Sequence, residues 1–213
     1  MTRPLWLLPL LLTACPDEPD PQPDGGLSCF VGNPGLDAEI QIVHRSVEGA
    51  IQTTSVAVPL IQPPQGGKVM LVGVRARNLD GCPLQLSASL RDECNNKILT
   101  LERRPVILEP QADGWAVPKD PINLDNFSNL PGCPRSDNDR RMNSEPYLLK
   151  VSVTDKAGRT AEQTQPITPY CGAEPEFARL CECECRSRFD REECPAVLPD
   201  AGTVPGTCWD GGT

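Results

Sequence analysis

The chain has little of what an enzyme or a nucleic-acid-binding protein needs. Its 213 residues include one histidine, His44, which alternates with Ile40 and Ile42 in a strand-like run and is expected to be structural. The G-x-S-x-G, H-E-x-x-H, P-loop and dinucleotide-binding glycine motifs are all absent. Lysine and arginine total 20 against 29 acidic residues, giving a net charge of −9, and no basic face is evident. We therefore expect a non-enzymatic protein that has no cofactor and binds no nucleic acid.

Aromatic residues and long apolar runs are scarce as well. Aromatic side chains make up 4% of the chain, so the core has to be built from valine, leucine and isoleucine. The most apolar run, residues 5–12, is far shorter than the roughly 20 residues that cross a bilayer as a helix. Because it follows a basic residue, Arg3, and precedes small residues, we interpret residues 1–14 as a secretory signal peptide.

The sequence LLTAC at residues 11–15 closes this run and resembles the lipobox of bacterial lipoproteins. The resemblance implies cleavage before Cys15 and attachment of a diacylglyceryl group to its sulfur, so the expected partner is the lipid bilayer. Two or three acyl chains give stable anchoring, whereas a single chain binds only marginally. Pro16, rather than an aspartate, follows the cysteine and favours the outer over the inner membrane. The alternative is ordinary cleavage after Ala14, with Cys15 left for a disulfide.

The segment after the anchor is expected to be a tether that ends near residue 36. Residues 16–28 read PDEPDPQPDGGLS, a composition that buries no core and stays extended or disordered. Such a spacer would hold the next domain away from the membrane at the cell envelope.

Cysteine is abundant, with eleven residues in the chain. If Cys15 carries lipid, ten remain, an even number that suits an oxidising compartment. We expect all ten to form disulfides: Cys29, Cys82, Cys94, Cys133, Cys171, Cys181, Cys183, Cys185, Cys194 and Cys208.

Residues 37–170 show the period-two alternation of half-buried strands and no clear helical stripe. The clearest strands are residues 84–91 and 147–154, followed by the row Met70, Val72, Val74 and Ala76. Weaker candidates are residues 39–45, 54–60, 97–101, 104–108 and 159–168. Two of these candidates contain a proline, Pro59 or Pro105, and are expected at strand ends or sheet edges. Proline has no backbone N–H to donate to a neighbouring strand. Residues 154–159 are typical of a hairpin turn.

The run YLLKVSVTDKAGRTAEQ, residues 147–163, resembles the last two strands of a bacterial immunoglobulin-like or PKD-like domain. The resemblance implies an all-β, antiparallel immunoglobulin-like β-sandwich over residues 37–170, with Tyr147 at the tyrosine corner. The Cys…Trp…Cys signature of true immunoglobulin domains is absent, since Trp115 falls in a loop. Proteins with this fold have many functions, so the resemblance implies no activity.

Almost 40 residues before Tyr147 show little regular pattern, apart from a strand suggested at residues 122–124. Irregular loops of this length are uncommon and are often functional or disordered. The loop at residues 109–146 is therefore the first place to expect an unknown protein or glycan ligand. The alternative is a structural excursion held in place by Cys133.

Residues 171–213 form a Cys-rich extension and tail, with a short helix expected to begin at Pro175. In that helix Cys181 and Cys185 share a face and Cys183 does not. The motif Cys-Glu-Cys-Glu-Cys at residues 181–185 admits a second function, as a copper- or zinc-handling or protein-inhibitory module. The spacing matches no zinc-finger motif, so we expect no metal and favour disulfides. A region this small buries too little apolar surface to be stable without such cross-links.

Strand geometry limits how the other four cysteines pair. Cys82 and Cys94 flank the strand at residues 84–91, so they lie roughly 40 Å apart, whereas a disulfide needs Cα atoms within about 7 Å. In a sandwich, the first strand starts at the end of the domain where Cys82 lies. The loop before Tyr147 lies at the opposite end, together with Cys94. This topology predicts the bonds Cys29–Cys82 and Cys94–Cys133. The six C-terminal cysteines would then pair among themselves in one of 15 ways.

Overall fold

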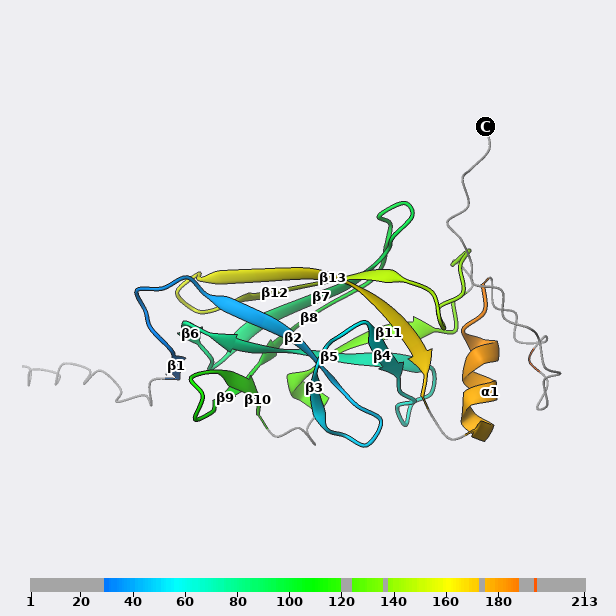
Figure 1. Ribbon diagram of the computed structural model, residues 1–213, viewed down its shortest axis with the longest axis horizontal. Helices are drawn as coiled ribbons and strands as arrows, with labels where there is room; N and C mark the ends of the chain where they lie inside the picture. Colours follow the sequence, from blue (N-terminus) through cyan, green and yellow to red (C-terminus); the bar gives the residue numbers. More distant parts are fainter. Residues whose placement is uncertain (1–28, 120–123, 136–137, 173–174, 188–193, 195–213) are drawn as a thin grey trace, which may run out of the picture.

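The computed structural model describes residues 29–119, 124–135, 138–172, 175–187 and 194, and these residues are mostly β (Figure 1). The elements in chain order are β1 (Phe30–Val31), β2 (Glu39–Arg45), β3 (Ile51–Thr53), β4 (Ala57–Leu60), β5 (Lys68–Arg77), β6 (Leu79–Asp80), β7 (Leu84–Asp92), β8 (Ile98–Val106), β9 (Leu108–Pro110), β10 (Ala116–Pro118), the 3₁₀ turn η1 (Leu124–Asn126), β11 (Ser128–Cys133), β12 (Tyr147–Thr154), β13 (Thr160–Cys171) and the helix α1 (Pro175–Glu184).

The longest strand of the six-stranded sheet is β5, and the sheet is organised around it. The strand order is β3-β2-β5-β10-β9, and β11 also pairs with β5, all in antiparallel register. Met70, Val72, Val74 and Ala76 alternate along β5 and are fully buried, as the period-two pattern predicts. The same row begins with Lys68, which is 3% exposed. A separate two-stranded sheet is formed by β1 and β6.

The second large sheet has the order β4-β13-β12-β7-β8. Its strands are antiparallel except for the pair β4 and β13, which is parallel. Pro59 and Pro105 lie on β4 and β8, the two outermost strands, so the prediction that these prolines mark edges is confirmed. The strand predicted at residues 147–154 is β12, and its alternate residues from Tyr147 to Val153 are fully buried.

The inward rows of the two large sheets form one hydrophobic core. Val72 and Val74 of β5 belong to the same buried cluster as Leu86 of β7 and Leu149 and Val151 of β12. Burying a side chain of this size contributes about 1.5–3 kcal/mol relative to leaving it exposed. The core is therefore made chiefly of aliphatic residues, as the low aromatic content predicts.

The hairpin between β12 and β13 confirms the predicted turn at residues 154–159. The backbone N–H of Asp155 donates to the carbonyl of Arg159 at 3.0 Å, and Asp155 Oδ1 accepts from the N–H groups of Ala157 and Arg159. Gly158 has φ of 80°, a backbone conformation that glycine adopts without strain.

The prediction of an irregular loop over residues 109–146 is wrong for much of its length. It contains β10, η1 and β11, and β11 is a full member of the six-stranded sheet. The strand suggested at residues 122–124 is not seen in the described part, because Leu124 begins η1 and residues 122–123 lie outside it. Residues 97–101 and 104–108 belong largely to the continuous strand β8. Short strands containing proline and glycine, as in β11, carry no clear alternation.

The helix α1 stands at the end of the molecule opposite β1 (Figure 1). It begins at Pro175, as predicted. No helix in the described residues is long and apolar enough to cross a membrane.

Candidate functional site

Every cysteine that the structure describes is oxidised. The bonds are Cys29–Cys82, Cys133–Cys185, Cys171–Cys181 and Cys183–Cys194, and Cys94 is also disulfide-bonded. Cys15 and Cys208 lie outside the described residues, so the structure places neither of them. Disulfides of this density are typical of proteins that fold in an oxidising compartment.

The predicted pair Cys29–Cys82 is present, and the predicted pair Cys94–Cys133 is wrong. Cys94 follows β7 in the five-stranded sheet, whereas Cys133 ends β11 in the six-stranded sheet. The chain beyond α1 brings Cys185 to Cys133, and the N–H of Met142 donates to the carbonyl of Cys185 at 2.8 Å. The expectation that the six C-terminal cysteines pair only among themselves therefore fails at Cys185.

Three sulfurs of these bonds converge where α1 meets the sheets. The Sγ atoms of Cys171, Cys181 and Cys185 all lie within 4.8 Å of one another. Cys181 lies on α1 and Cys185 directly follows it, and their sulfurs are on the same side, 3.8 Å apart. Thiolates in this arrangement would suit a soft metal ion. Each of the three sulfurs is instead half of a disulfide, and a disulfide sulfur is not a thiolate ligand.

An apolar cavity of about 430 Å³ opens beside the same helix. Its volume falls within the range of about 300–1,000 Å³ that small-molecule sites occupy. Leu60 ends β4, Lys68 begins β5, and the segment between these strands forms much of the wall. The lining residues are Val47, Leu60, Ile61, Gln62, Pro63, Pro64, Lys68 and Cys181.

Lys68 gives this apolar wall its charge. Its side chain is 4% exposed, and its Nζ donates to Gln62 Oε1 at 3.1 Å and to a carboxylate oxygen of Glu184. The Glu184 side chain, on α1, is 21% exposed. An unpaired buried ammonium is costly, so Glu184 compensates the charge that β5 places inside the protein.

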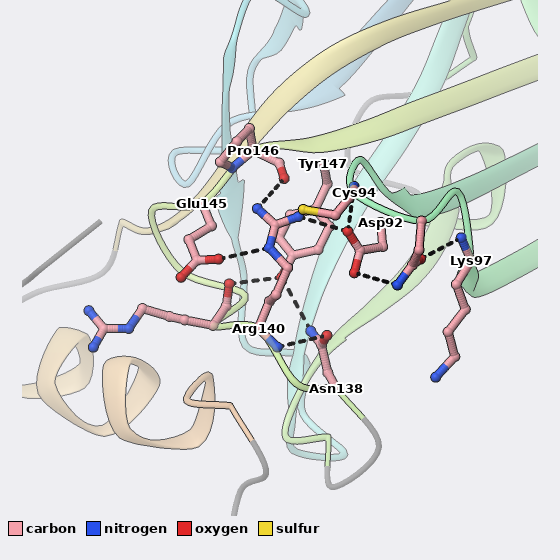
Figure 2. A network of polar contacts seen from close by, with 10 residues as sticks. Asp92, Cys94, Lys97, Asn138, Arg140, Glu145, Pro146 and Tyr147 are labelled. Carbon is pink, nitrogen blue, oxygen red and sulfur yellow. Dashed lines mark hydrogen bonds and ion pairs between the residues drawn. The ribbon is translucent and has the colours of Figure 1, made fainter. Parts of the chain in front are cut away.

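A polar network ties the loop before β12 to the turn after β7 (Figure 2). Arg140 donates to Asp92 at 2.8 Å, to Glu145 at 3.0 Å and to the carbonyl of Pro146 at 3.2 Å. Its guanidinium also lies over the ring of Tyr147, 5.0 Å from the centroid. Burial alone would lower the pKa of Arg140, but the hydrogen bond and charge of Asp92, with Tyr147 and Glu145, raise it. All of these groups are paired with one another, which fits a structural role better than a ligand site.

Tyr147 is the buried centre of that network. Its hydroxyl donates to the backbone carbonyl of Arg141 at 2.8 Å and accepts from Asn138 Nδ2 at 3.2 Å (Figure 2). Burial raises the pKa of Tyr147 to about 12, because the phenolate would lose its hydration. The hydroxyl of this buried tyrosine thus bonds back to the chain six residues earlier.

His44 lies on β2 and is 4% exposed. Its Nδ1 is 3.1 Å from the hydroxyl of Thr54, and burial lowers its pKa. Its neighbour in the described structure is a hydroxyl group, not a carboxylate or a nucleophilic thiol.

The cavity does not lie where the sequence led us to expect a ligand site. It is formed largely by residues 60–68, on the segment between two strands, and by no described residue within 109–146. One signal could have pointed to it, because Lys68 continues the inward row of β5 and so places a cation at a buried position. The contribution of Cys181 to the wall could not be seen, since it depends on where α1 docks.

Comparisons with known proteins assign the chain to no family. No protein-family model matches it. Searches among curated proteins and among solved structures each find no significant match.

Proposed function

We propose that the protein is a membrane-anchored exported lipoprotein with a non-catalytic binding role at the cell envelope. The observation that carries this proposal is the oxidised state of all nine described cysteines, which supports export to a compartment where disulfides persist. The LLTAC motif supplies the anchor at Cys15, and the outer membrane is the favoured location. The apolar cavity beside α1 is the proposed binding site.

The domain on this anchor is proposed to be an immunoglobulin-like sandwich. In such folds strands A, B and E share one sheet, and strands C, F and G share the other, with C′ added beyond C in variable-type domains. Here β2, β5 and β11 share one sheet, and β7, β12 and β13 share the other, with β8 beyond β7. The tyrosine-corner bond from Tyr147 at the start of β12 supports the same assignment.

Replacement of the anchor residue tests the localisation. In cells fed an alkyne-bearing fatty acid, the unmodified full-length protein should carry the label and be found in the membrane fraction. The Cys15→Ala variant should carry no label and should no longer be found in the membrane fraction. The membrane anchor is refuted if the unmodified protein takes up no label and stays in the soluble fraction.

Binding at the cavity is tested with Nile red, a neutral dye that fluoresces in apolar sites. Val47 lines the cavity and is 42% exposed, so Val47→Asp should abolish dye binding without disturbing the core. Val56, which is 59% exposed and does not line the cavity, provides the matched control Val56→Asp. Failure of the unmodified protein to bind the dye, or equal loss in both variants, would rule out this site.

A metal-handling role for the Cys cluster is the second candidate, favoured by the convergence of the Cys171, Cys181 and Cys185 sulfurs. The disulfides count against it, because copper(I) and zinc need thiolates. Protein isolated from the envelope under non-reducing conditions decides between the two. Three or more free thiols with bound copper or zinc would favour metal handling, and none would favour the binding role.

A further inference from the structure

We propose that the apolar cavity takes a monocarboxylate with an apolar chain, such as a fatty acid of medium length. This inference rests on the proposed binding role and names the ligand class for the same site. It follows from the combination of an apolar wall with one buried cation.

The wall favours a ligand whose body is a hydrocarbon. Five of the lining residues are aliphatic or proline, and the sulfur-bearing Cys181 adds a sixth apolar group. Transfer of a ligand's apolar surface from water into such a site is favourable by about 25 cal/mol per Å². Polar ligands such as sugars would leave most of their hydroxyl groups without partners on this wall, which is unfavourable.

Lys68 selects the head group. Among the described residues that line the cavity it is the sole charged side chain. Its Nζ carries three donors, of which Gln62 and Glu184 accept two. A ligand carboxylate would pair with this buried ammonium through a charge-assisted hydrogen bond, which is stronger than a bond to a neutral acceptor.

Glu184 is the carboxylate that Lys68 already pairs with, so a ligand carboxylate would have to compete with it. It comes from α1, a separate element from the strand that carries Lys68, and its side chain is 21% exposed while that of Lys68 is 4% exposed. When a ligand carboxylate binds Lys68, Glu184 is the partner expected to turn to water, because it is the more exposed of the two. Glu184 is thus an internal competitor, and a neutral ligand gains nothing from displacing it.

The test measures displacement of Nile red from the full-length protein by decanoate, by decanol and by methyl decanoate at pH 7. We expect decanoate to compete at least tenfold more strongly than either neutral analogue. Glu184→Gln should strengthen decanoate binding at least threefold, because Lys68 then has no internal carboxylate. Lys68→Met should reduce decanoate to the level of decanol. Lys150→Met is the matched control. Lys150 also pairs with a glutamate, Glu162, at 2.7 Å, but on the exposed surface, so this variant should leave decanoate binding unchanged.

Each other outcome overturns a defined part of the proposal. If the dye binds and decanol competes as well as decanoate, the ligand class is wrong while the binding cavity stands. If Glu184→Gln weakens decanoate binding, Glu184 helps to bind the ligand and is not its competitor. If no dye binds to the unmodified protein, the binding role fails together with this inference. The comparison of decanoate with decanol needs no variant, so it decides the ligand class even if Lys68→Met folds poorly.

Discussion

The Sγ atoms of Cys181 and Cys185 lie 3.8 Å apart, yet each is bonded to a different strand. Cys181 is bonded to Cys171 on β13, in the five-stranded sheet, and Cys185 is bonded to Cys133 on β11, in the six-stranded sheet. One short helical segment is therefore joined covalently to both large sheets. The α1 wall of the cavity is held in place by these two bonds and by the ion pair of Lys68 with Glu184.

Removal of the two bonds should destabilise the protein unequally. Cys133 and Cys185 are 52 residues apart in sequence, and Cys171 and Cys181 are 10 apart. In the chain-entropy model, a bond that closes a longer loop removes more conformational entropy from the unfolded chain and so stabilises the protein more. The double variant Cys133→Ser, Cys185→Ser should therefore lower the free energy of unfolding by about 4 kcal/mol, and Cys171→Ser, Cys181→Ser by about 3 kcal/mol. Urea unfolding measures both. An equal or reversed order would contradict the larger contribution predicted for the bond that closes the longer loop.

The hydrogen bond from Tyr147 to the Arg141 carbonyl makes its own prediction. Tyr147→Phe removes the hydroxyl that bonds to the Arg141 carbonyl and leaves Asn138 Nδ2 without that acceptor. The free energy of unfolding should fall by about 1–3 kcal/mol, the usual cost of an unsatisfied buried polar group. Tyr170→Phe, at a position that is 37% exposed, is the control and should have little effect. If the two variants are equally stable, the hydrogen bond of Tyr147 contributes nothing to stability.

The sequence predicts the regular strands well because their evidence is local. The buried row on β5, the alternation on β12 and the proline-marked edges at Pro59 and Pro105 can each be deduced from neighbouring residues. The cavity and the Cys133–Cys185 bond cannot, since both depend on where α1 docks after about 40 residues of intervening chain. Disulfide pairing is likewise open from sequence alone, because six cysteines allow 15 connectivities.

Arg140 should be important for stability. Its partners Asp92 and Glu145 each have side chains 8% exposed, so Arg140→Met would leave two buried carboxylates without their cation. Breaking a buried pair in this way typically costs about 3–5 kcal/mol. Thermal unfolding can be compared with that of Arg77→Met, whose side chain is 40% exposed and pairs with Glu39. Equal losses in the two variants would show that the network in Figure 2 is no stronger than a surface ion pair.

Acid should destabilise the protein partly through His44. Burial lowers the pKa of His44 below 6.5, so near this pH the unfolded chain binds a proton more readily than the folded chain. Its contribution to stability is complete above about pH 6.5 and is lost as the pH falls towards and below the lowered pKa of the folded state. His44→Gln, which keeps a polar group near Thr54, should flatten the dependence of unfolding free energy on pH between about pH 7 and 5. An unchanged slope would contradict the buried, neutral histidine.

Disulfide mapping by mass spectrometry, on native protein taken from the membrane fraction without reduction, is the most direct test of the oxidised domain. We predict a cross-linked peptide pair containing Cys133 and Cys185, another containing Cys171 and Cys181, and no alkylation of any of these four residues. Alkylation of Cys133 and Cys185 as free thiols in freshly isolated protein would contradict the oxidised, helix-stapled domain on which the export and binding proposals rest.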